Sequence, residues 1–187
     1  MFSLDAVDDG ALPSKWHLQP VQPQDFEAML AIRIEALRPS LERLGRFDPV
    51  RARERFAAGF TPAHMRHIEV DSVRVGFITL RPDDGVLPLS LKLDHLYLKT
   101  HAQGAGAGTW ALNWAKAQAA AAQRDISLSA LKQSDANRFY VRHGFVLVGQ
   151  SEFDLDYRWS HLTALGCNVT EKVAHGVQPE VRQQVTV

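Results

Sequence analysis

The glycine-rich stretch Gln103-Gly104-Ala105-Gly106-Ala107-Gly108 is the feature that most constrains how this chain can fold. It lies between an apolar segment predicted as a strand, residues 89–98, and a segment of good helix formers, residues 109–124. Glycines without side chains let a ligand approach the backbone, and a helix start presents free N–H groups and a partial positive charge. The stretch therefore predicts a socket for a phosphate or pyrophosphate at a strand-to-helix turn.

Two common nucleotide-binding loops do not fit this stretch. The dinucleotide-binding pattern needs its third glycine one position later and an acidic residue at the end of the next strand, whereas Asp125 precedes that strand. The Walker loop needs a lysine before its Ser or Thr, whereas Gly108 stands directly before Thr109. Taken alone, the glycines leave both ligand binding and mere close packing open.

Composition excludes several classes of protein. The 187 residues include 21 basic and 21 acidic side chains, and this neutral balance argues against a nucleic-acid partner. No apolar run approaches the roughly 18 residues of a membrane span, and residues 1–15 lack the apolar core of a secretory signal. Cys167 is the single cysteine, so no internal disulfide is expected, and the spacing of His64 and His67 does not suggest a metal site. We expect a cytoplasmic protein.

Hydrophobic periodicity predicts one α/β domain with a mixed sheet. Residues 1–15 are expected to be a lead-in, residues 16–160 the folded domain and residues 161–187 a weakly patterned tail. Pro39 is expected to end the first helix, and the second helix is expected to include Leu41, Leu44 and a basic segment over residues 51–56. Arg51, Arg53 and Arg55 are interpreted as a solvated helix face. Strands are predicted over residues 16–21, 67–70, 73–80, 89–98, 126–131, 145–150 and 153–159, and further helices over 26–37, 109–124 and 136–143.

Two segments together resemble motifs of the GNAT N-acetyltransferase superfamily. In motif A, a Gln or Arg is followed after two residues by Gly and, after one more, by Gly or Ala; Gln103, Gly106 and Gly108 occupy these positions. The segment SDANRFYVRHGF, residues 134–145, resembles motif B, commonly NPANRLYxxxGF, with Ser134 and Asp135 as departures. The order of predicted elements also resembles that of the superfamily, so the resemblance covers residues 16–159.

The resemblance implies a GNAT-like fold and acetyl-CoA as co-substrate. The fold would be a mixed, mostly antiparallel sheet of about seven strands with a central V-shaped gap, flanked by about four helices. The amides of the pantetheine arm would pair with the edge of one central strand, like an added β-strand, and the pyrophosphate would lie on the glycine stretch. Cofactor contacts are expected from Leu96, Tyr97, Leu98, Gln103, Gly104, Ala105, Gly106, Ala107, Gly108, Thr109, Asn137 and Tyr140.

The resemblance also implies transfer of an acetyl group to a primary amine of a small molecule or a peptide, by direct attack in a ternary complex. Tyr140 matches a tyrosine that often protonates the leaving thiolate. Asp94 and His95 are alternative general bases, and strand alternation lets only one of them face the site. Glu35 is a candidate for the acceptor pocket.

One alternative function and one question of assembly stay open. The alternative is a non-catalytic module of the same fold that binds or senses acyl-CoA without turning it over. This alternative stays open because no general base is obvious in the sequence. Dimers are common in the superfamily, so the resemblance also raises a homodimer.

Overall fold

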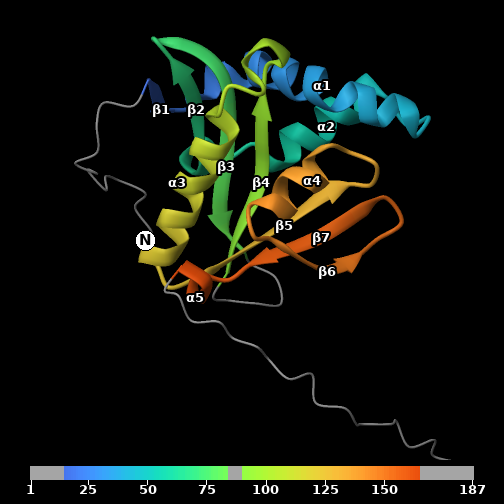
Figure 1. Ribbon diagram of the computed structural model, residues 1–187. Helices are drawn as coiled ribbons and strands as arrows, with labels where there is room; N and C mark the ends of the chain where they lie inside the picture. Colours follow the sequence, from blue (N-terminus) through green and yellow to red (C-terminus); the bar gives the residue numbers. More distant parts are fainter. Residues whose placement is uncertain (1–14, 84–89, 165–187) are drawn as a thin grey trace, which may run out of the picture.

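A seven-stranded sheet forms the centre of the computed structural model, which describes residues 15–83 and 90–164 (Figure 1). The strands follow the order β1-β2-β3-β4-β5-β7-β6, and all neighbours are antiparallel except β4 and β5, which run parallel. The predicted mixed, mostly antiparallel sheet is therefore confirmed. The strands are β1 Trp16–Pro20, β2 Met65–Val70, β3 Val73–Pro82, β4 Ser90–Leu98, β5 Asp125–Leu131, β6 Val146–Gln150 and β7 Asp154–Trp159.

Helices cover the sheet on both faces. They are α1 Phe26–Arg43, α2 Pro49–Gly59, α3 Ala107–Ala121, α4 Ala136–Arg142 and the short α5 His161–Ala164, joined by 3-10 turns at Pro23–Asp25, Pro62–His64 and Thr100–Ala102. None of these described helices is both long enough and apolar enough to cross a membrane. The predicted lead-in up to residue 14 and the predicted tail from residue 165, which includes Cys167, lie outside the described residues.

Each face of the sheet carries its own apolar core. Helix α3 packs on one face through alanines four residues apart, Ala107, Ala111, Ala115 and Ala119, which are all buried. Small side chains at this spacing let the helix backbone approach the sheet closely. Helices α1 and α2 pack on the other face around a separate core with Phe77 of β3 at its centre.

The first helix is longer than the sequence predicted. Pro39 lies inside α1 and does not end it. A proline removes only its own N–H, which would have bonded to the carbonyl of Glu35, so the cost falls on a single turn. The helix ends instead at Arg43, and Gly45 just beyond it has a φ of +63°, which favours glycine, and an N–H that bonds to the carbonyl of Glu42. Leu41 consequently belongs to α1 and not to the second helix.

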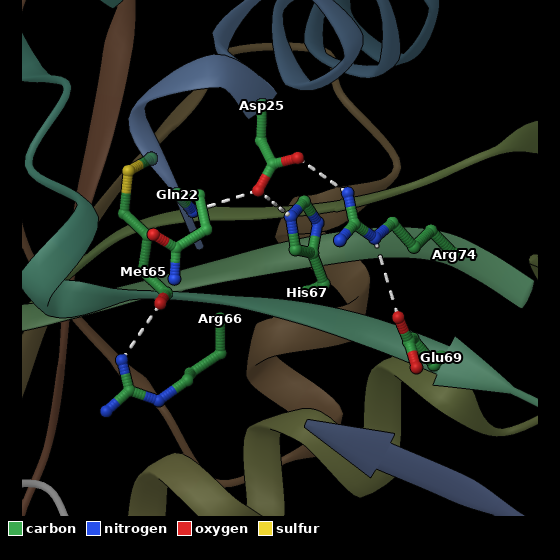
Figure 2. A network of polar contacts seen from close by, with 7 residues as sticks. All are labelled: Gln22, Asp25, Met65, Arg66, His67, Glu69 and Arg74. Atoms are coloured by element: carbon green, nitrogen blue, oxygen red, sulfur yellow. Dashed lines mark hydrogen bonds and ion pairs between the residues drawn. The ribbon is translucent and has the colours of Figure 1, made fainter. Parts of the chain in front are cut away.

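A buried polar network ties the start of α1 to the sheet (Figure 2). Asp25 is 9% exposed, and its Oδ2 accepts hydrogen bonds from the N–H of Gln22 and from Nε2 of His67, at 2.8 and 3.0 Å. Its Oδ1 accepts from Arg74 at 2.6 Å, and Arg74 also pairs with Glu69. These partners lower the pKa of Asp25 to about 2 although burial opposes the shift.

The sheet opens between β4 and β5. Only residues 90–92 of β4 pair with residues 125–127 of β5, and beyond this short ladder the two strands diverge. Figure 1 shows β5, β7 and β6 turning away from the first four strands. The V-shaped gap implied by the resemblance is thus present, and it contains the candidate site.

Candidate active site

A cleft of about 1180 Å³ occupies the gap between β4 and β5. Its walls come from β4, from β5, from the start of α3, from α4 and from α1 and α2. Residues far apart in the sequence therefore meet there, and each wall offers different chemistry.

The edge of β4 offers free backbone groups to the cleft. The N–H of Lys99 donates to the carbonyl of Val75 in β3, so Lys99 and Tyr97 direct their backbone groups towards β3. Leu96, which precedes Tyr97, and Leu98, which follows it, therefore direct their backbone N–H and carbonyl groups towards the gap, where β5 has diverged. Gln103 folds back so that its Nε2 donates to the carbonyl of Leu98 at 3.1 Å. This edge can pair with an extended, amide-bearing arm.

A β-bulge at Asp94 sets which side chains of β4 face the cleft. Thr79 pairs with His95 and Leu80 with Leu93, so Asp94 is an extra residue opposite β3. Leu93 before the bulge and Leu96 after it consequently lie on the same face of the sheet, although they are three residues apart.

The glycine stretch forms the predicted strand-to-helix turn. Gly104 and Gly106 have φ of +75° and +95°, and α3 begins at Ala107. No side chain among the described residues caps this helix, so its first N–H groups are available to a ligand. A Cβ on Gly108 would lie 3.5 Å from Leu98 and 3.7 Å from Phe139. A Cβ at Gly108 would thus be in ordinary van der Waals contact, and the free N–H groups at the helix start, with no side chain before them, fit a pyrophosphate.

Tyr140 of α4 lines the cleft and is 8% exposed. Its hydroxyl makes no hydrogen bond to the described residues, which leaves the proton available. Burial raises the pKa of Tyr140, and the nearby hydroxyl of Tyr97 adds to the shift. The phenol is therefore protonated at neutral pH, as a proton donor must be.

The two predicted bases differ in their access to the cleft, although the bulge interrupts the alternation and leaves both on the face of β4 opposite Leu93 and Leu96. Asp94 lines the cleft, and its Oδ2 pairs with Nε of Arg81. His95 is not among the lining residues: it packs against Phe56 and Phe77, and its Nδ1 lies 3.0 Å from the hydroxyl of Thr79. Burial, followed by the charge of Arg33, lowers the pKa of His95 to about 4.

Other predicted contacts divide between the cleft and its surroundings. Glu35 lines the cleft, and its Oε1 accepts from the N–H and the hydroxyl of Thr100 at 2.9 and 2.7 Å; the first bond is the larger cause of its lowered pKa. Asn137 does not line the cleft, because its amide bonds to Leu131, Ser134 and Tyr157. Of the remaining predicted contacts, Leu96, Tyr97, Leu98, Gln103, Gly104, Gly106, Gly108 and Thr109 line the cleft, whereas Ala105 and Ala107 do not.

The end of α1 reaches across the cleft, which the sequence did not indicate. Nη2 of Arg43 donates to the carbonyl of Gln133 at 3.2 Å, beyond the end of β5. The guanidinium of Arg46 lies 3.7 Å from the ring centre of Phe153, just before β7. These contacts join segments about 90 and 100 residues apart, so no local pattern signals them.

A hydrogen-bonded pair beside the glycine stretch was also missed. Nε2 of His143 lies 3.1 Å from the hydroxyl of Thr109, and its Nδ1 donates to the carbonyl of Phe139 at 2.7 Å. Both His143 and Thr109 line the cleft. The last turn of α4 is thereby fixed against the first turn of α3, where the phosphate socket lies.

Comparison with protein families identifies the fold. Residues 63–147 match the family model described as acetyltransferase (GNAT) domain. The chain carries a GNAT acetyltransferase domain. Proteins of this family are acyl-CoA-dependent acetyltransferases. The matched residues contain β2 to β5, α3, α4 and the whole glycine stretch.

Solved structures share the fold of this GNAT domain. The PaiA N-acetyltransferase of Thermoplasma acidophilum, in complex with coenzyme A, is similar with a TM-score of 0.60 at 16% identity, over 78% of this chain and 98% of that chain. An acetyltransferase of Thermus thermophilus has a TM-score of 0.60 at 19% identity, over 78% and 96%. A GNAT-family acetyltransferase of Listeria monocytogenes has a TM-score of 0.55 at 17% identity, over 78% and 94%. No match was found among curated protein sequences.

Proposed function

We propose that this GNAT domain transfers the acetyl group of acetyl-CoA to a primary amine, of a small molecule or a peptide, by direct attack in a ternary complex. The observation that carries the proposal is the gap between β4 and β5, which joins an uncapped helix start to a buried, protonated Tyr140. One ligand with a pyrophosphate, an amide-bearing arm and a terminal thioester matches these three features in order.

The binding roles follow from the backbone. The first N–H groups of α3 hold the pyrophosphate, and Leu96 and Leu98 pair with the amides of the arm. Gln103 releases the carbonyl of Leu98 when the arm arrives, and its amide turns to the phosphates. Tyr97 supports the site by packing against Phe77. Asn137 supports it by donating a hydrogen bond to the carbonyl of Ser134, which holds the turn before α4.

The proton transfers require a general base and a general acid, and these roles fall to Asp94 and Tyr140. The co-substrate supplies a thioester whose carbonyl carbon accepts a nucleophile. An alkylammonium has a pKa of about 10.4 in water, so it must lose a proton before its nitrogen can attack. Asp94 accepts that proton, since its carboxylate lines the cleft. The C–N bond then forms, the C–S bond breaks, and the hydroxyl of Tyr140 protonates the departing sulfur.

The proton balance closes over one turnover. The ammonium gives up two protons as it becomes a neutral amide. One of them restores the hydroxyl of Tyr140, and the other passes from Asp94 to solvent. His95 has no part in this sequence because it lies in the aromatic core beside Phe77.

Titration calorimetry with acetyl-CoA tests the binding half of the proposal. We expect binding by the unaltered protein and an affinity at least about tenfold weaker in Gly108→Val, because a branched side chain fills the space beside Leu98 and Phe139. Gly59→Ala is the matched control, since a Cβ there meets nothing within 4 Å. Absence of binding at millimolar acetyl-CoA would refute the proposal.

Release of free thiol with a panel of amines tests the catalytic half. Turnover with at least one amine supports transfer. Tight acyl-CoA binding without thiol release for any amine would favour the alternative, a non-catalytic module that senses acyl-CoA.

A further inference from the structure

Three arginines gather on the wall of the cleft that α1 and α2 form. Arg33 of α1 and Arg51 and Arg55 of α2 all line the cleft, and we call them the arginine wall. Nη1 of Arg33 donates to the carbonyl of Ala52 at 3.2 Å, so its guanidinium lies against the first turns of α2. Arg51 and Arg55 are four residues apart and share one side of that helix.

The arginine wall carries charge that the described part of the protein does not balance. None of its three members makes an ion pair with a carboxylate among the described residues. Arg53, between them on α2, pairs with Glu27, and Arg81 pairs with Asp94. The Nε–H of Arg33 is buried and has no hydrogen-bond partner among the described residues. A buried donor in this state is unfavourable until a ligand supplies an acceptor.

The cleft carboxylates that come from α1 and from the start of α2 are engaged elsewhere. Glu35 holds Thr100, and Asp48 caps α2 by accepting from the N–H groups of Val50 and Arg51. Asp154, at the start of β7 on the other side of the gap, makes no ion pair with a described residue. Arg33 and Asp154 both line the cleft, Arg33 from α1 and Asp154 from the β7 side of the gap.

The arginine wall lies apart from the phosphate socket. Arg33 and Glu35 are two residues apart on α1, which places them on nearly opposite sides of the helix. Glu35 faces Thr100, at the turn that leads into the glycine stretch, whereas Arg33 faces α2 and the ring of Phe56. The arginine wall therefore belongs to the half of the cleft that receives the acceptor.

We infer that the amine acceptor carries a carboxylate, which Arg33 binds with Arg51 and Arg55 beside it, while the amine lies towards Asp154. The acceptor is thus of the amino-acid type. This inference rests on the proposed N-acetyltransferase function. A guanidinium presents two parallel N–H groups to a carboxylate, and charge-assisted bonds of this kind are stronger than neutral ones.

Matched pairs of acceptors test the inference. Thiol release is measured with α-amino acids and with their carboxamides, which keep the amine and lose the charge. We expect kcat/KM to be at least about tenfold higher for the carboxylates. In Arg33→Gln we expect KM to rise about tenfold or more for the carboxylates only, with the affinity for acetyl-CoA unchanged. Arg33→Lys, which keeps the charge and loses the paired N–H groups, falls in between.

Two controls separate this effect from damage to the fold. The double variant Arg51→Gln, Arg55→Gln changes exposed side chains only. It should raise the KM for carboxylate acceptors less than Arg33→Gln does. Arg53→Gln, on the same helix but outside the cleft lining, should leave the preference intact.

The outcomes separate the inference from the proposed function. Equal turnover of carboxylates and carboxamides, or an equal loss of both in Arg33→Gln, overturns the inference and leaves the transferase function standing. A weaker affinity of Arg33→Gln for acetyl-CoA would also overturn it, since Arg33 would then hold the cofactor. Absence of thiol release with every amine overturns the proposed function and the inference with it.

Discussion

Replacing Asp25 by asparagine should destabilise the protein in a manner that depends on pH. The carboxylate accepts hydrogen bonds from Gln22, His67 and Arg74 in a largely buried site, and an amide keeps the shape but loses the charge (Figure 2). The hydrogen bond with His67 does most to lower the pKa of Asp25, against the opposing effect of burial. Asp25 joins the start of α1 to β2 and β3, so its loss affects the packing of the helix that carries Arg33 and Glu35.

The magnitude follows from the pKa of Asp25. A fall from 3.8 to about 2 corresponds to about 2 kcal/mol of folding free energy at 1.36 kcal/mol per pKa unit. Because the folded pKa lies below the unfolded one, the unfolded state binds more protons between these values. The stabilisation is therefore fully present above pH 3.8 and is lost as the pH falls through about 2.

Urea unfolding of the two proteins across this pH range measures the effect. At pH 7 we expect Asp25→Asn to lower the midpoint by about 1 M, given a denaturant slope of about 2 kcal/mol per molar. The difference between the two proteins should shrink as the pH approaches 2, because the remaining carboxylates are common to both. Glu27→Gln is the matched control, since Glu27 forms only an exposed pair with Arg53, and we expect little change.

A constant difference between wild type and Asp25→Asn from pH 7 to pH 2 would refute this reasoning. The contribution would then come from packing and not from ionisation. A midpoint that does not move at pH 7 would show that the buried network adds no net stability.

Three further predictions concern the site and its frame. Tyr140→Phe should lower kcat about a hundredfold and leave the affinity for acetyl-CoA unchanged; an unaltered rate of thiol release would remove Tyr140 from the chemistry. Gly76→Ala should cost about 1–3 kcal/mol in thermal or urea unfolding, because its Cβ would lie 2.3 Å from the carbonyl oxygen of Tyr97; wild-type stability would contradict the close approach. Between pH 4 and 6.5 the unfolded state protonates His95 more than the folded state does, so stability should rise with pH there. In His95→Gln this part of the rise should vanish, and a rise of equal size would assign it to another group.

Local patterns were sufficient to predict the strands and the glycine turn. Alternation marks the buried residues of β5, and positive φ at Gly104 and Gly106 is a backbone requirement that a glycine can signal by itself. The length of α1 was not predicted because the cost of Pro39 is local, whereas the contacts that hold the last turn, such as that of Arg43 with Gln133, are distant in the sequence.

The acceptor half of the cleft escaped prediction for a related reason. Arg51, Arg53 and Arg55 look alike in the sequence and were interpreted as one solvated face. Only their surroundings separate them: Arg53 meets Glu27, whereas the other two line the cleft beside Arg33. The charge balance around an arginine depends on which carboxylates lie next to it in the folded protein, and a local sequence pattern does not contain that information.

The bulge at Asp94 works as a phase shift in the middle of β4. Leu91 and Leu93 before it and Leu96 and Leu98 after it lie on one face only because one residue interrupts the alternation. Straightening the bulge with every residue kept would turn Leu96 and Leu98 into the opposite core. Removing position 94 would instead give a regular strand in which Leu93 and Leu96 stand two residues apart and stay on one face. The extra residue is therefore not needed to place the leucines; what it adds is the carboxylate that lines the cleft. A deletion and a substitution at position 94 should both remove that carboxylate while the leucines keep their face.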